Sequence, residues 1–522
     1  MQGSGSTTSV WMATAATPQG TADPQSVQPD VVPDVIVVGA GIAGVSVAYF
    51  LQRSGKTVLL LDDGAPGDGE TGRTTAHLSN AIDDRFTEIE RLHGRDGARL
   101  AAESHGTAID AIERICREEG IACDFTRLDG WLMAAPGQDP ADLDKELQAA
   151  HRAGLTGVEK HDHAPGIAHP GPALRFPDQG MFHPLKYLNG LVEAFRRRGG
   201  TLATDAHVTT LEETTDGVRV HIQGDGAPAR AFEARAVVVA TNAPISDRVT
   251  IHSKQAPYRT YAIGLKVARD ALPAALWWDD LDAYHYVRLQ PEADHAVLIV
   301  GGEDHKTGEA DDMDLRYARL EAWTREHFPM AGEVLYRWSG QVMEPFDGLA
   351  FIGRDPAYWG RVFVVTGDSG MGMTHGTLAG LMLCELVHGH DHPWATLYDP
   401  SRKMIRKLGT YLRENLDAAR HLARAAFGPS DVDSEDRIKP GEGAIMKTFG
   451  RPMAVYRDEQ GALHRMSAVC PHLKCTVEWN PGEKTWDCPC HGSRFACDGA
   501  VLNGPATSAL AKVEQEVHGK GK

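Results

Sequence analysis

Two short segments near the carboxyl end of the chain hold cysteine and histidine side chains at close spacing. The first reads Cys470-Pro-His472, and fifteen residues later the second reads Cys488-Pro-Cys490-His491. Thiolate sulfur is a soft ligand that suits iron–sulfur clusters and zinc, and imidazole nitrogen suits iron and zinc. The spacing therefore predicts a metal centre held between two loops, each of which supplies a thiolate and an imidazole.

Two kinds of centre accept four such ligands. A structural zinc ion takes two cysteines and two histidines in a tetrahedron, whereas a Rieske [2Fe–2S] centre takes two cysteines on one iron and two histidines on the other. Here each loop carries one cysteine and one histidine, instead of a cysteine pair followed by a distant histidine pair. Cys475 and Cys490 also add a second thiol to each loop. This arrangement favours the iron–sulfur centre over the zinc site.

Residues 470–493 resemble the Rieske proteins of cytochrome bc complexes. Ring-hydroxylating dioxygenases, the other large group of Rieske proteins, lack the second pair of cysteines. The resemblance implies that each iron has two protein ligands and that a disulfide ties the loops together over the cluster. The residues implied are Cys470 and Cys488 on one iron, His472 and His491 on the other, and Cys475 and Cys490 in the disulfide.

Two further positions bear on the reduction potential of this centre. By the same resemblance, Ser493 lies where the family uses a hydroxyl group to hydrogen-bond a cluster sulfur. Phe495 stands where the high-potential members have a tyrosine. Fewer hydrogen bonds to the sulfurs lower the potential. We therefore expect an intermediate potential, below that of the respiratory proteins.

A second motif lies near the amino end and predicts a dinucleotide site. The segment from Asp34 to Gly44 reads as a Val/Ile strand, a tight turn and the start of a helix, with Gly39, Gly41 and Gly44 spaced Gly-x-Gly-x-x-Gly. Glycines at this spacing let the backbone approach a pyrophosphate at the helix N-terminus. Asp62 closes the next strand, 18 residues after Gly44, where an acid hydrogen-bonds the adenosine ribose.

Later segments indicate FAD as the dinucleotide. Residues 367–376 follow a strand and open a helix, whose N–H groups can hold the electron-rich edge of a flavin. Together with residues 72–77, 183–187 and 240–244, they resemble the D-amino-acid oxidase/glycine oxidase superfamily of FAD enzymes over roughly residues 32–425. The implied FAD contacts are Gly39, Gly41, Gly44, Asp62, Arg73, Thr74, Thr75, Val208, Gly370, Gly372, Met373 and Thr374.

With the metal centre included, the whole chain resembles bacterial FAD-dependent oxidoreductases with a fused Rieske domain. The implied fold is an α/β Rossmann-like FAD-binding domain, an interleaved α+β substrate domain with an antiparallel sheet, and a small all-β Rieske domain. The expected parts are a disordered tail (1–31, rich in small and polar residues), an FAD oxidoreductase (32–427), a linker (428–436) and the Rieske domain (437–522). Within 32–427, FAD-binding parts fall at about 32–90, 180–250 and 335–427, and substrate parts at about 91–179 and 251–334.

Three residues are candidates for roles near the flavin ring. His77 resembles the position at which some amine dehydrogenases of the superfamily attach flavin covalently; the alternative is an ordinary flavin contact or a packing residue. Arg288 lies on an expected strand and could hold a substrate carboxylate bidentately, although a surface arginine fits equally well. His375 stands at the helix start that faces the flavin, where its role is either catalytic or structural.

Composition excludes some partners. The formal net charge of −18 argues against nucleic acid or an anionic membrane as the main partner. The longest apolar run, Val35 to Leu51, contains the dinucleotide glycines, so we expect no membrane span. The first basic residue is Arg53, and five of the eight cysteines lie between 470 and 497. These features predict a cytoplasmic protein without a targeting signal.

The predicted function is that of an FAD-dependent dehydrogenase. It oxidises a small organic substrate, an amine or amino acid, and passes electrons from flavin through the Rieske cluster to an external acceptor or carrier. No second Gly-x-Gly-x-x-Gly unit follows a strand directly and opens a helix, which argues against electron entry from NAD(P)H. Two alternatives remain: a reductase that is fed through the cluster, and a Rieske domain that serves as a redox sensor or docking module.

Overall fold

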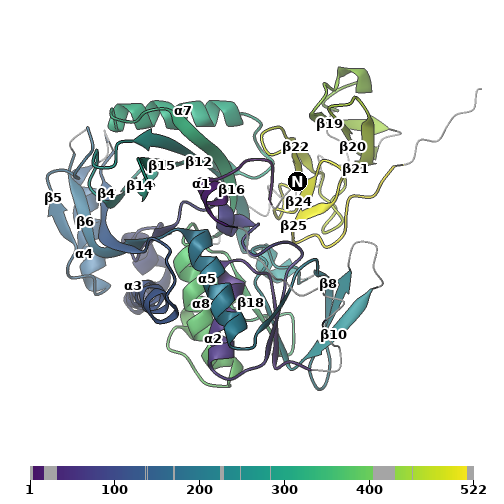
Figure 1. Cartoon of the computed structure of the whole chain (residues 1–522), viewed down its shortest axis with the longest axis horizontal. Coiled ribbons are helices and arrows are strands. Elements are labelled where there is room, and N and C mark those ends of the chain that lie inside the picture. Colours follow the sequence, from purple (N-terminus) through teal and green to yellow (C-terminus); the bar gives the residue numbers. More distant parts are fainter. Residues whose placement is uncertain are drawn as a thin grey trace, which may run out of the picture.

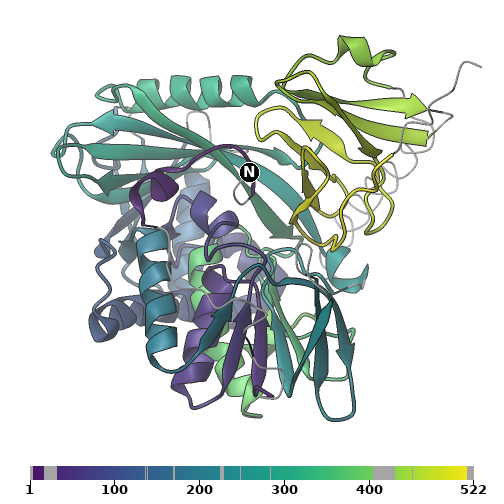
Figure 2. The ribbon, with the colours of Figure 1, turned by 45° about the vertical axis from the view of Figure 1, so that its right-hand side comes forward.

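The computed structural model describes residues 4–16, 27, 32–135, 137, 139–168, 171–223, 229–246, 249–281, 284–403, 430–448 and 451–513. Within these ranges, two large sheets with their helices form one part of the molecule, and the last eighty or so described residues form a separate group of small sheets beside them (Figures 1 and 2). In the described part of the chain, no helix has the length and apolar character needed to cross a membrane.

The first large sheet has six strands in the order β17-β18-β11-β1-β2-β7. Neighbouring strands are parallel from β18 to β7, and β17 is antiparallel to β18. Runs of Val, Ile and Leu that are buried on both faces are typical of such a parallel sheet. Its strands are β1 (Val35–Val38), β2 (Val58–Leu61), β7 (Thr201–Ala203), β11 (Ala236–Val239), β17 (Phe351–Arg354) and β18 (Val362–Thr366).

The two faces of this sheet are covered differently. A layer of helices packs on one face, and the antiparallel meander β8-β9-β10 packs on the other (Figure 1). Ile36 and Val38 of the sheet share one buried cluster with Val220 and Phe232 of the meander. The sheet with its two covers confirms the Rossmann-like prediction. The helices are α2 (Ile42–Arg53), α3 (Phe86–Glu119), α5 (Pro184–Arg197) and α8 (Gly372–Val387); the meander is β8 (His207–Glu213), β9 (Val218–Gln223) and β10 (Arg230–Ala234).

The second large sheet has nine strands and forms one wall of the site described below. Its order is β16-β12-β15-β14-β13-β4-β6-β3, with β5 paired to β6. The pair β13 and β4 is parallel, so the sheet is mixed and not wholly antiparallel as expected; every other pair is antiparallel. The strands are β3 (His77–Leu78), β4 (Thr126–Met133), β5 (Glu159–His161), β6 (Ala173–Met181), β12 (Gln255–Val267), β13 (Ala275–Asp279), β14 (Tyr286–Pro291), β15 (Ala296–Lys306) and β16 (Val334–Pro345).

Two strands of this sheet come from segments that the sequence division assigns to the FAD-binding part. β16 pairs along β12 from Gln255 opposite Pro345 to Leu265 opposite Val334, and β3 pairs with β6. The two domains therefore exchange strands more often than the division predicts. The remaining helices are α4 (Pro140–Arg152), α6 (Val249–His252), α7 (Met313–His327), α9 (Ala395–Tyr398) and the 3-10 turn η2 (Glu70–Arg73).

The Rieske part consists of two small antiparallel sheets, β19-β20-β21 and β22-β23-β24-β25. This confirms the all-β prediction for the C-terminal domain. The metal-ligand loops connect β21 to β22 and β23 to β24. The elements are η4 (Glu435–Arg437), β19 (Glu442–Thr448), β20 (Arg451–Arg457), β21 (Leu463–Ser467), β22 (Glu478–Asn480), β23 (Thr485–Asp487), β24 (Arg494–Ala496) and β25 (Val501–Asn503).

The amino-terminal segment corrects one prediction. A disordered tail is expected over residues 1–31, but Val10–Thr14 forms the helix α1, whose Trp11 is fully buried. The Trp11 indole donates a 2.6 Å hydrogen bond to the carbonyl of Thr74. The expectation is wrong for residues 4–16, because tertiary burial of one tryptophan outweighs the polar composition around it. Residues 17–26 and 28–31 lie outside the described residues.

Candidate functional site

The glycine turn between β1 and α2 is shaped for close approach of a ligand. Gly39 has φ +103°, and a Cβ atom there would overlap the backbone carbonyl of Ala240. A Cβ atom on Gly44 would overlap the carbonyl of Gly39, so Gly44 lets α2 pack against the turn. Gly41 caps α2 without a side chain, which leaves the helix N-terminus open to the cavity. This geometry fits a pyrophosphate.

Asp62 lies beside this turn at the end of β2. Its carboxylate accepts hydrogen bonds from the backbone N–H groups of Ala40 and Gly64, the latter at 2.8 Å. Burial, with a smaller contribution from Asp63, raises the pKa of Asp62 to about 7. A ribose hydroxyl group that donates to the carboxylate would stabilise its charged form, so the position fits the predicted role.

A cavity of about 1140 Å³ runs from the end of β2 to the nine-stranded sheet. This exceeds the range of about 300–1,000 Å³ of ordinary small-molecule pockets, as a dinucleotide together with a substrate requires. Gly44, Thr374 and Arg288 are absent from its described lining. The predicted site residues that do line it are Gly39, Gly41, Asp62, Arg73, Thr74, Thr75, His77, Val208, Gly370, Gly372, Met373 and His375.

The start of α8 lines one end of this cavity. Gly370 has φ +71°, and the Met371 N–H donates to the Asp368 carbonyl at 2.8 Å. His375 Nδ1 lies 2.9 Å from the same carbonyl, and burial lowers the pKa of His375 to about 4. Thr374 turns away, since its hydroxyl group donates to the Met371 carbonyl and contacts His105. His375 is thus a neutral imidazole on the cavity, and Thr374 positions the turn.

His77 lies on β3 and faces the same cavity. Its Nδ1 is 3.2 Å from the Thr75 hydroxyl group, and its Nε2 is 3.2 Å from the Val287 carbonyl. Burial and the nearby charge of Arg288 lower the pKa of His77 to about 3. The imidazole is therefore neutral and held from both sides.

The structure does not place Arg288 where a substrate carboxylate could reach it. The guanidinium is fully buried and donates to the carbonyls of Ala76 and Phe182 at 2.8 and 2.9 Å, and to the side chain of Gln290 at 2.7 Å. It also lies over the Trp11 ring, 5.2 Å from the centroid. The prediction of a carboxylate clamp is wrong, because these donors already have partners and the residue lies off the cavity.

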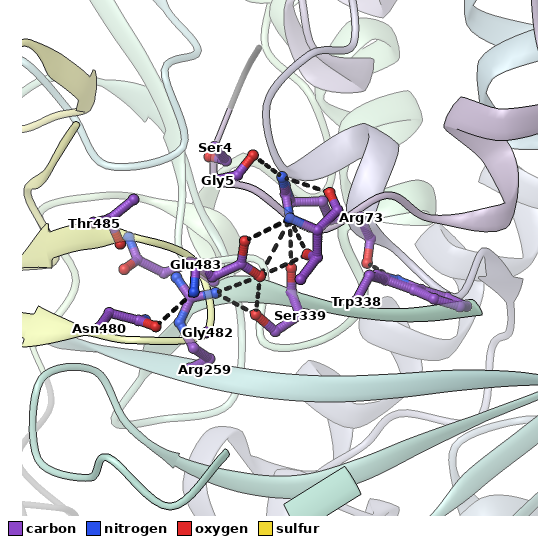
Figure 3. Close-up of polar contacts among 12 residues, drawn as sticks. Ser4, Gly5, Arg73, Arg259, Trp338, Ser339, Asn480, Gly482, Glu483 and Thr485 are labelled. Carbon is purple, nitrogen blue, oxygen red and sulfur yellow. Dashed lines mark hydrogen bonds and ion pairs between the residues drawn. The ribbon is translucent and has the colours of Figure 1, made fainter. Parts of the chain in front are cut away.

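Arg73 borders the cavity, but its guanidinium is turned toward the Rieske domain. It donates to the carbonyls of Gly5 (3.0 Å) and Ser339 (3.1 Å), and it pairs with the Glu483 carboxylate at 3.4 Å (Figure 3). Glu483 follows β22 in the Rieske domain. Arg73 therefore joins three segments of the chain, and any contact with FAD falls to its backbone or to the stem of its side chain.

The metal-ligand loops are held in register by backbone hydrogen bonds. The Cys470 N–H donates to the Cys475 carbonyl and the Cys488 N–H to the Ser493 carbonyl, each at 2.8 Å. Cys470 and Cys488 are buried. The predicted disulfide is present between Cys475 and Cys490, whose Cα atoms are 6.5 Å apart. Both of its sulfurs lie within 4.8 Å of the Cys488 sulfur, so the disulfide borders the centre.

The four predicted ligands are brought together and fit a [2Fe–2S] cluster. The rings of His472 and His491 have centroids 5.2 Å apart. His491 Nδ1 is buried and has no hydrogen-bond partner among the described residues, which leaves it free for a metal. The Cys470 and Cys488 thiols contact each other, as two ligands of one iron require.

A histidine of the flavoprotein part covers this ligand pair. The His252 ring, at the end of α6, lies 4.9 Å from His472 and 5.6 Å from His491 between centroids, and it is buried. Gln341 of β16 donates to the Gly492 carbonyl at 2.9 Å. The histidine side of the centre therefore faces the flavoprotein domain. Nothing in the sequence around His252 marks it, because only the docking of the two domains gives it this position.

The Ser493 hydroxyl group contacts the Cys470 thiol and accepts a 3.0 Å hydrogen bond from the Ala506 N–H. We expect Ser493→Ala to lower the midpoint potential of the cluster by about 40 mV, which corresponds to one hydrogen bond of about 1 kcal/mol in a one-electron couple. Phe495→Tyr, at a fully buried position in the same core, is expected to raise it. Redox titration followed by EPR measures both, and equal potentials in all three proteins would contradict the assignment.

Comparisons with known proteins agree with this geometry. The model of the family "FAD dependent oxidoreductase" matches residues 34–386, and that of the "Rieske [2Fe-2S] domain" matches residues 429–514. The putative Rieske 2Fe-2S iron-sulfur protein YhfW of Bacillus subtilis (strain 168) is 30% identical over 491 residues, which cover 94% of this chain and 95% of that protein. These matches decide the metal centre in favour of the iron–sulfur cluster.

Two further proteins resemble the flavoprotein part. Gamma-glutamylputrescine oxidoreductase of Escherichia coli (strain K12) is 27% identical over 372 residues, or 68% of this chain and 84% of that protein. The crystal structure of glycine oxidase from Geobacillus kaustophilus superposes with a TM-score of 0.57 at 19% identity, covering 71% of this chain and 99% of that one; it shows the shared fold. The chain belongs to the FAD dependent oxidoreductase family, with a Rieske [2Fe–2S] domain joined to its carboxyl end.

Proposed function

We propose that the protein is a dehydrogenase of an amine or amino acid, in which electrons pass from FAD to the [2Fe–2S] cluster and then to an external acceptor in the cytoplasm. When bound, FAD takes two electrons from an organic substrate, and the cluster carries them onward one at a time. The observation that supports this most is the burial of the histidine side of the centre against the flavoprotein domain by His252 and Gln341.

A buried cluster of Arg73, Arg259, Ser339 and Glu483, which we call the joint, connects the two domains and holds this orientation in place. Glu483 lies between Arg73 and Arg259 and accepts a hydrogen bond from the Ser339 hydroxyl group (Figure 3). The buried Arg494, next to the second ligand loop, lies 3.8 Å from the Glu70 carboxylate of the flavoprotein domain. Because these groups are buried, the centre is fixed relative to the flavin cavity. A fixed orientation favours electron transfer within one chain. It does not suit a domain that swings away to reach a distant partner.

The reaction removes two hydrogens from the substrate. A C–H bond beside the amine nitrogen and an N–H bond break, and a C=N bond forms. Bound FAD would supply the acceptor for the carbon-bound hydrogen with both electrons, and the nitrogen-bound hydrogen would leave as a proton. The neutral imidazoles of His77 and His375 line the cavity and add no positive charge to repel an ammonium substrate.

The test is anaerobic mixing of the holoprotein with a panel of amines and amino acids. We expect one class of substrate to bleach the flavin absorbance and to raise a Rieske-type EPR signal without any added donor. If the flavin bleaches while the cluster stays oxidised, transfer within the chain is excluded. If only a reduced carrier bleaches the flavin, electrons enter through the cluster. Unchanged turnover of Cys488→Ser with an artificial acceptor and loss of partner binding would indicate a sensor domain.

A further inference from the structure

The end of the cavity beneath the nine-stranded sheet is walled by acidic side chains. Asp304 extends from β15, Glu344 from β16, and Asp83 from the loop that precedes α3, and all three line the cavity. The three carboxyl groups act on one another electrostatically, with Asp83 raising the pKa of both others. They form one acidic cluster, which we call the carboxylate wall.

Aromatic side chains complete this end of the cavity. The Tyr284 hydroxyl group donates to Asp83, and the hydroxyl groups of Tyr286 and Thr260 hydrogen-bond each other, each pair at 2.5 Å. The two tyrosine rings lie 5.3 Å apart and are tilted by 41°. Trp278 lines the same cavity. Aromatic faces attract ammonium groups, most strongly where water is displaced, so the aromatic and acidic groups favour the same kind of ligand.

Among the described residues, no cationic side chain forms an ion pair with the carboxylate wall; Arg85 and Arg316 act on Asp83 and Asp304 from beyond ion-pair distance. The described lining of the cavity contains no lysine, and its single arginine, Arg73, is engaged at the domain joint. None of the ion pairs formed by the described residues includes Asp83, Asp304 or Glu344. Asp304 Oδ1 is buried and accepts no hydrogen bond within the described chain. Burying a carboxylate oxygen without a hydrogen-bond partner costs free energy. A bound cation would supply the missing partner.

The titration behaviour supports this interpretation. Burial raises the pKa of Asp304 to about 7 and that of Glu344 well above its usual range, and it also raises the pKa of Asp83. Arg316 lowers the pKa of Asp304 only in part. A ligand ammonium group beside these carboxyl groups favours their charged forms and lowers their pKa values. A cation bound at the wall therefore shifts these carboxyl groups toward their charged forms.

We propose that the substrate is an amine with a second cationic group and no carboxylate, and that Asp304 is the residue that selects for this second charge. The proposal rests on the proposed oxidation of an amine and names its class. The carboxylate wall offers no cationic partner to a substrate carboxylate, and the arginine that could have received one, Arg288, lies off the cavity. The diamine class is thus favoured over the amino acid class.

The test compares four probes of similar length on the FAD-loaded, cluster-loaded protein without oxygen: 1,4-diaminobutane, n-butylamine, ornithine and 4-aminobutyrate. Perturbation of the flavin spectrum gives each Kd, and bleaching gives each rate of reduction. We expect 1,4-diaminobutane to bind about tenfold or more tightly than each of the others, the equivalent of one charge-assisted contact. Equal or tighter binding of n-butylamine, ornithine or 4-aminobutyrate would overturn the proposal.

Substitution of Asp304 in the carboxylate wall provides the second part of the test. Asp304→Asn keeps the shape of the side chain and is expected to weaken 1,4-diaminobutane binding about tenfold while leaving the Kd of n-butylamine nearly unchanged. Glu303→Gln is the matched control, because Glu303 is the adjacent residue on β15, pairs with Arg319 and does not line the cavity. Equal losses for both probes, or no loss, in Asp304→Asn would contradict the assigned role.

The two proposals fail in different ways. If no amine or amino acid bleaches the flavin, but 1,4-diaminobutane still binds more tightly than the carboxylate-bearing probes, the cation site stands and the proposed oxidation is wrong. If ornithine or 4-aminobutyrate bleaches the flavin and 1,4-diaminobutane does not, the oxidation stands and the cation site is wrong. Flavin content and melting temperature, measured on each variant, show that the variant has folded. If Asp304→Asn does not fold, the four-probe comparison on the unaltered protein decides.

Discussion

Replacing Glu483 with glutamine destabilises the joint between the Rieske and flavoprotein domains by about 3–5 kcal/mol, the usual cost of removing one partner from a buried ion pair. Glu483 is 1% exposed and lies 3.4 Å from Arg73 and 3.9 Å from Arg259. It also accepts hydrogen bonds from the hydroxyl groups of Ser339 and Thr7. Loss of its charge leaves two guanidinium groups buried without their shared anion. Denaturant unfolding, followed by flavin fluorescence and by cluster absorbance, measures the change.

The same variant tests whether the joint orients the metal centre. We expect the rate of cluster reduction by a bleaching substrate to fall in Glu483→Gln, while the rate of flavin bleaching stays the same. Glu459→Gln is the control, because Glu459 is exposed on the same domain and such surface changes usually stay within about 0.5 kcal/mol. Unfolding curves of Glu483→Gln that overlay those of the unaltered protein would show that the joint adds no stability.

Acid is expected to open the same joint. Burial alone would raise the pKa of Glu483, but Arg73, Arg259 and Arg494 outweigh it and hold that pKa below its usual range. Asp487 is likewise lowered, against burial, by Arg494 and Arg259. Groups with a depressed pKa in the folded state stabilise it above their unfolded values and lose that contribution as the pH falls through the folded pKa. The joint is therefore stable at neutral pH and weakens below about pH 4.

Trp11→Ala is expected to cost about 3–5 kcal/mol of stability, as for other fully buried aromatic side chains. The centroid of the Trp11 ring lies 5.0 Å from that of His183, and the ring packs under the Arg288 guanidinium. Its N–H group donates a hydrogen bond to the Thr74 carbonyl. Since Thr74 lines the cavity, release of FAD should also become faster. Thermal unfolding and the fluorescence of released flavin measure the two effects.

The control for this substitution comes from the same helix. Ala13→Ser changes an exposed position of α1 and is expected to alter the melting temperature little. If Trp11→Ala melts and retains flavin like the unaltered protein, the amino-terminal helix is not part of the stable fold. Such a result would restore the disordered tail that composition predicts.

The motifs with local geometry could be predicted from the sequence. The Gly39 turn and the Cys470 and Cys488 loops depend on neighbouring residues in the chain, so their spacing carries the information. The sequence does not show which face of the nine-stranded sheet each side chain occupies. Arg288 and Asp304 both lie on strands of one sheet, yet one is buried behind the cavity and the other lines it. That difference follows from the pairing of nine strands, including the parallel pair β13 and β4.

The amino-terminal helix and the position of His252 could not be predicted from the sequence for a related reason. Composition over thirty residues describes an average, and a single Trp11 in a polar segment does not change it. Its pocket is built by Thr74, His183 and Arg288, which are distant in sequence. His252 likewise gains its position from docking against His472 and His491. Contacts between distant segments leave no periodic signal in either partner.

The joint also determines when its contacts can form during synthesis of the chain. Ser4 hydrogen-bonds Asn503 across 499 positions, and Arg73 precedes Glu483 by 410. At roughly 5–20 residues per second, the ribosome adds Glu483 roughly 20–80 s after Arg73. Throughout that interval the Arg73 guanidinium has no carboxylate from the Rieske domain to pair with. The buried ion pair can therefore form only after nearly the whole chain has been synthesised.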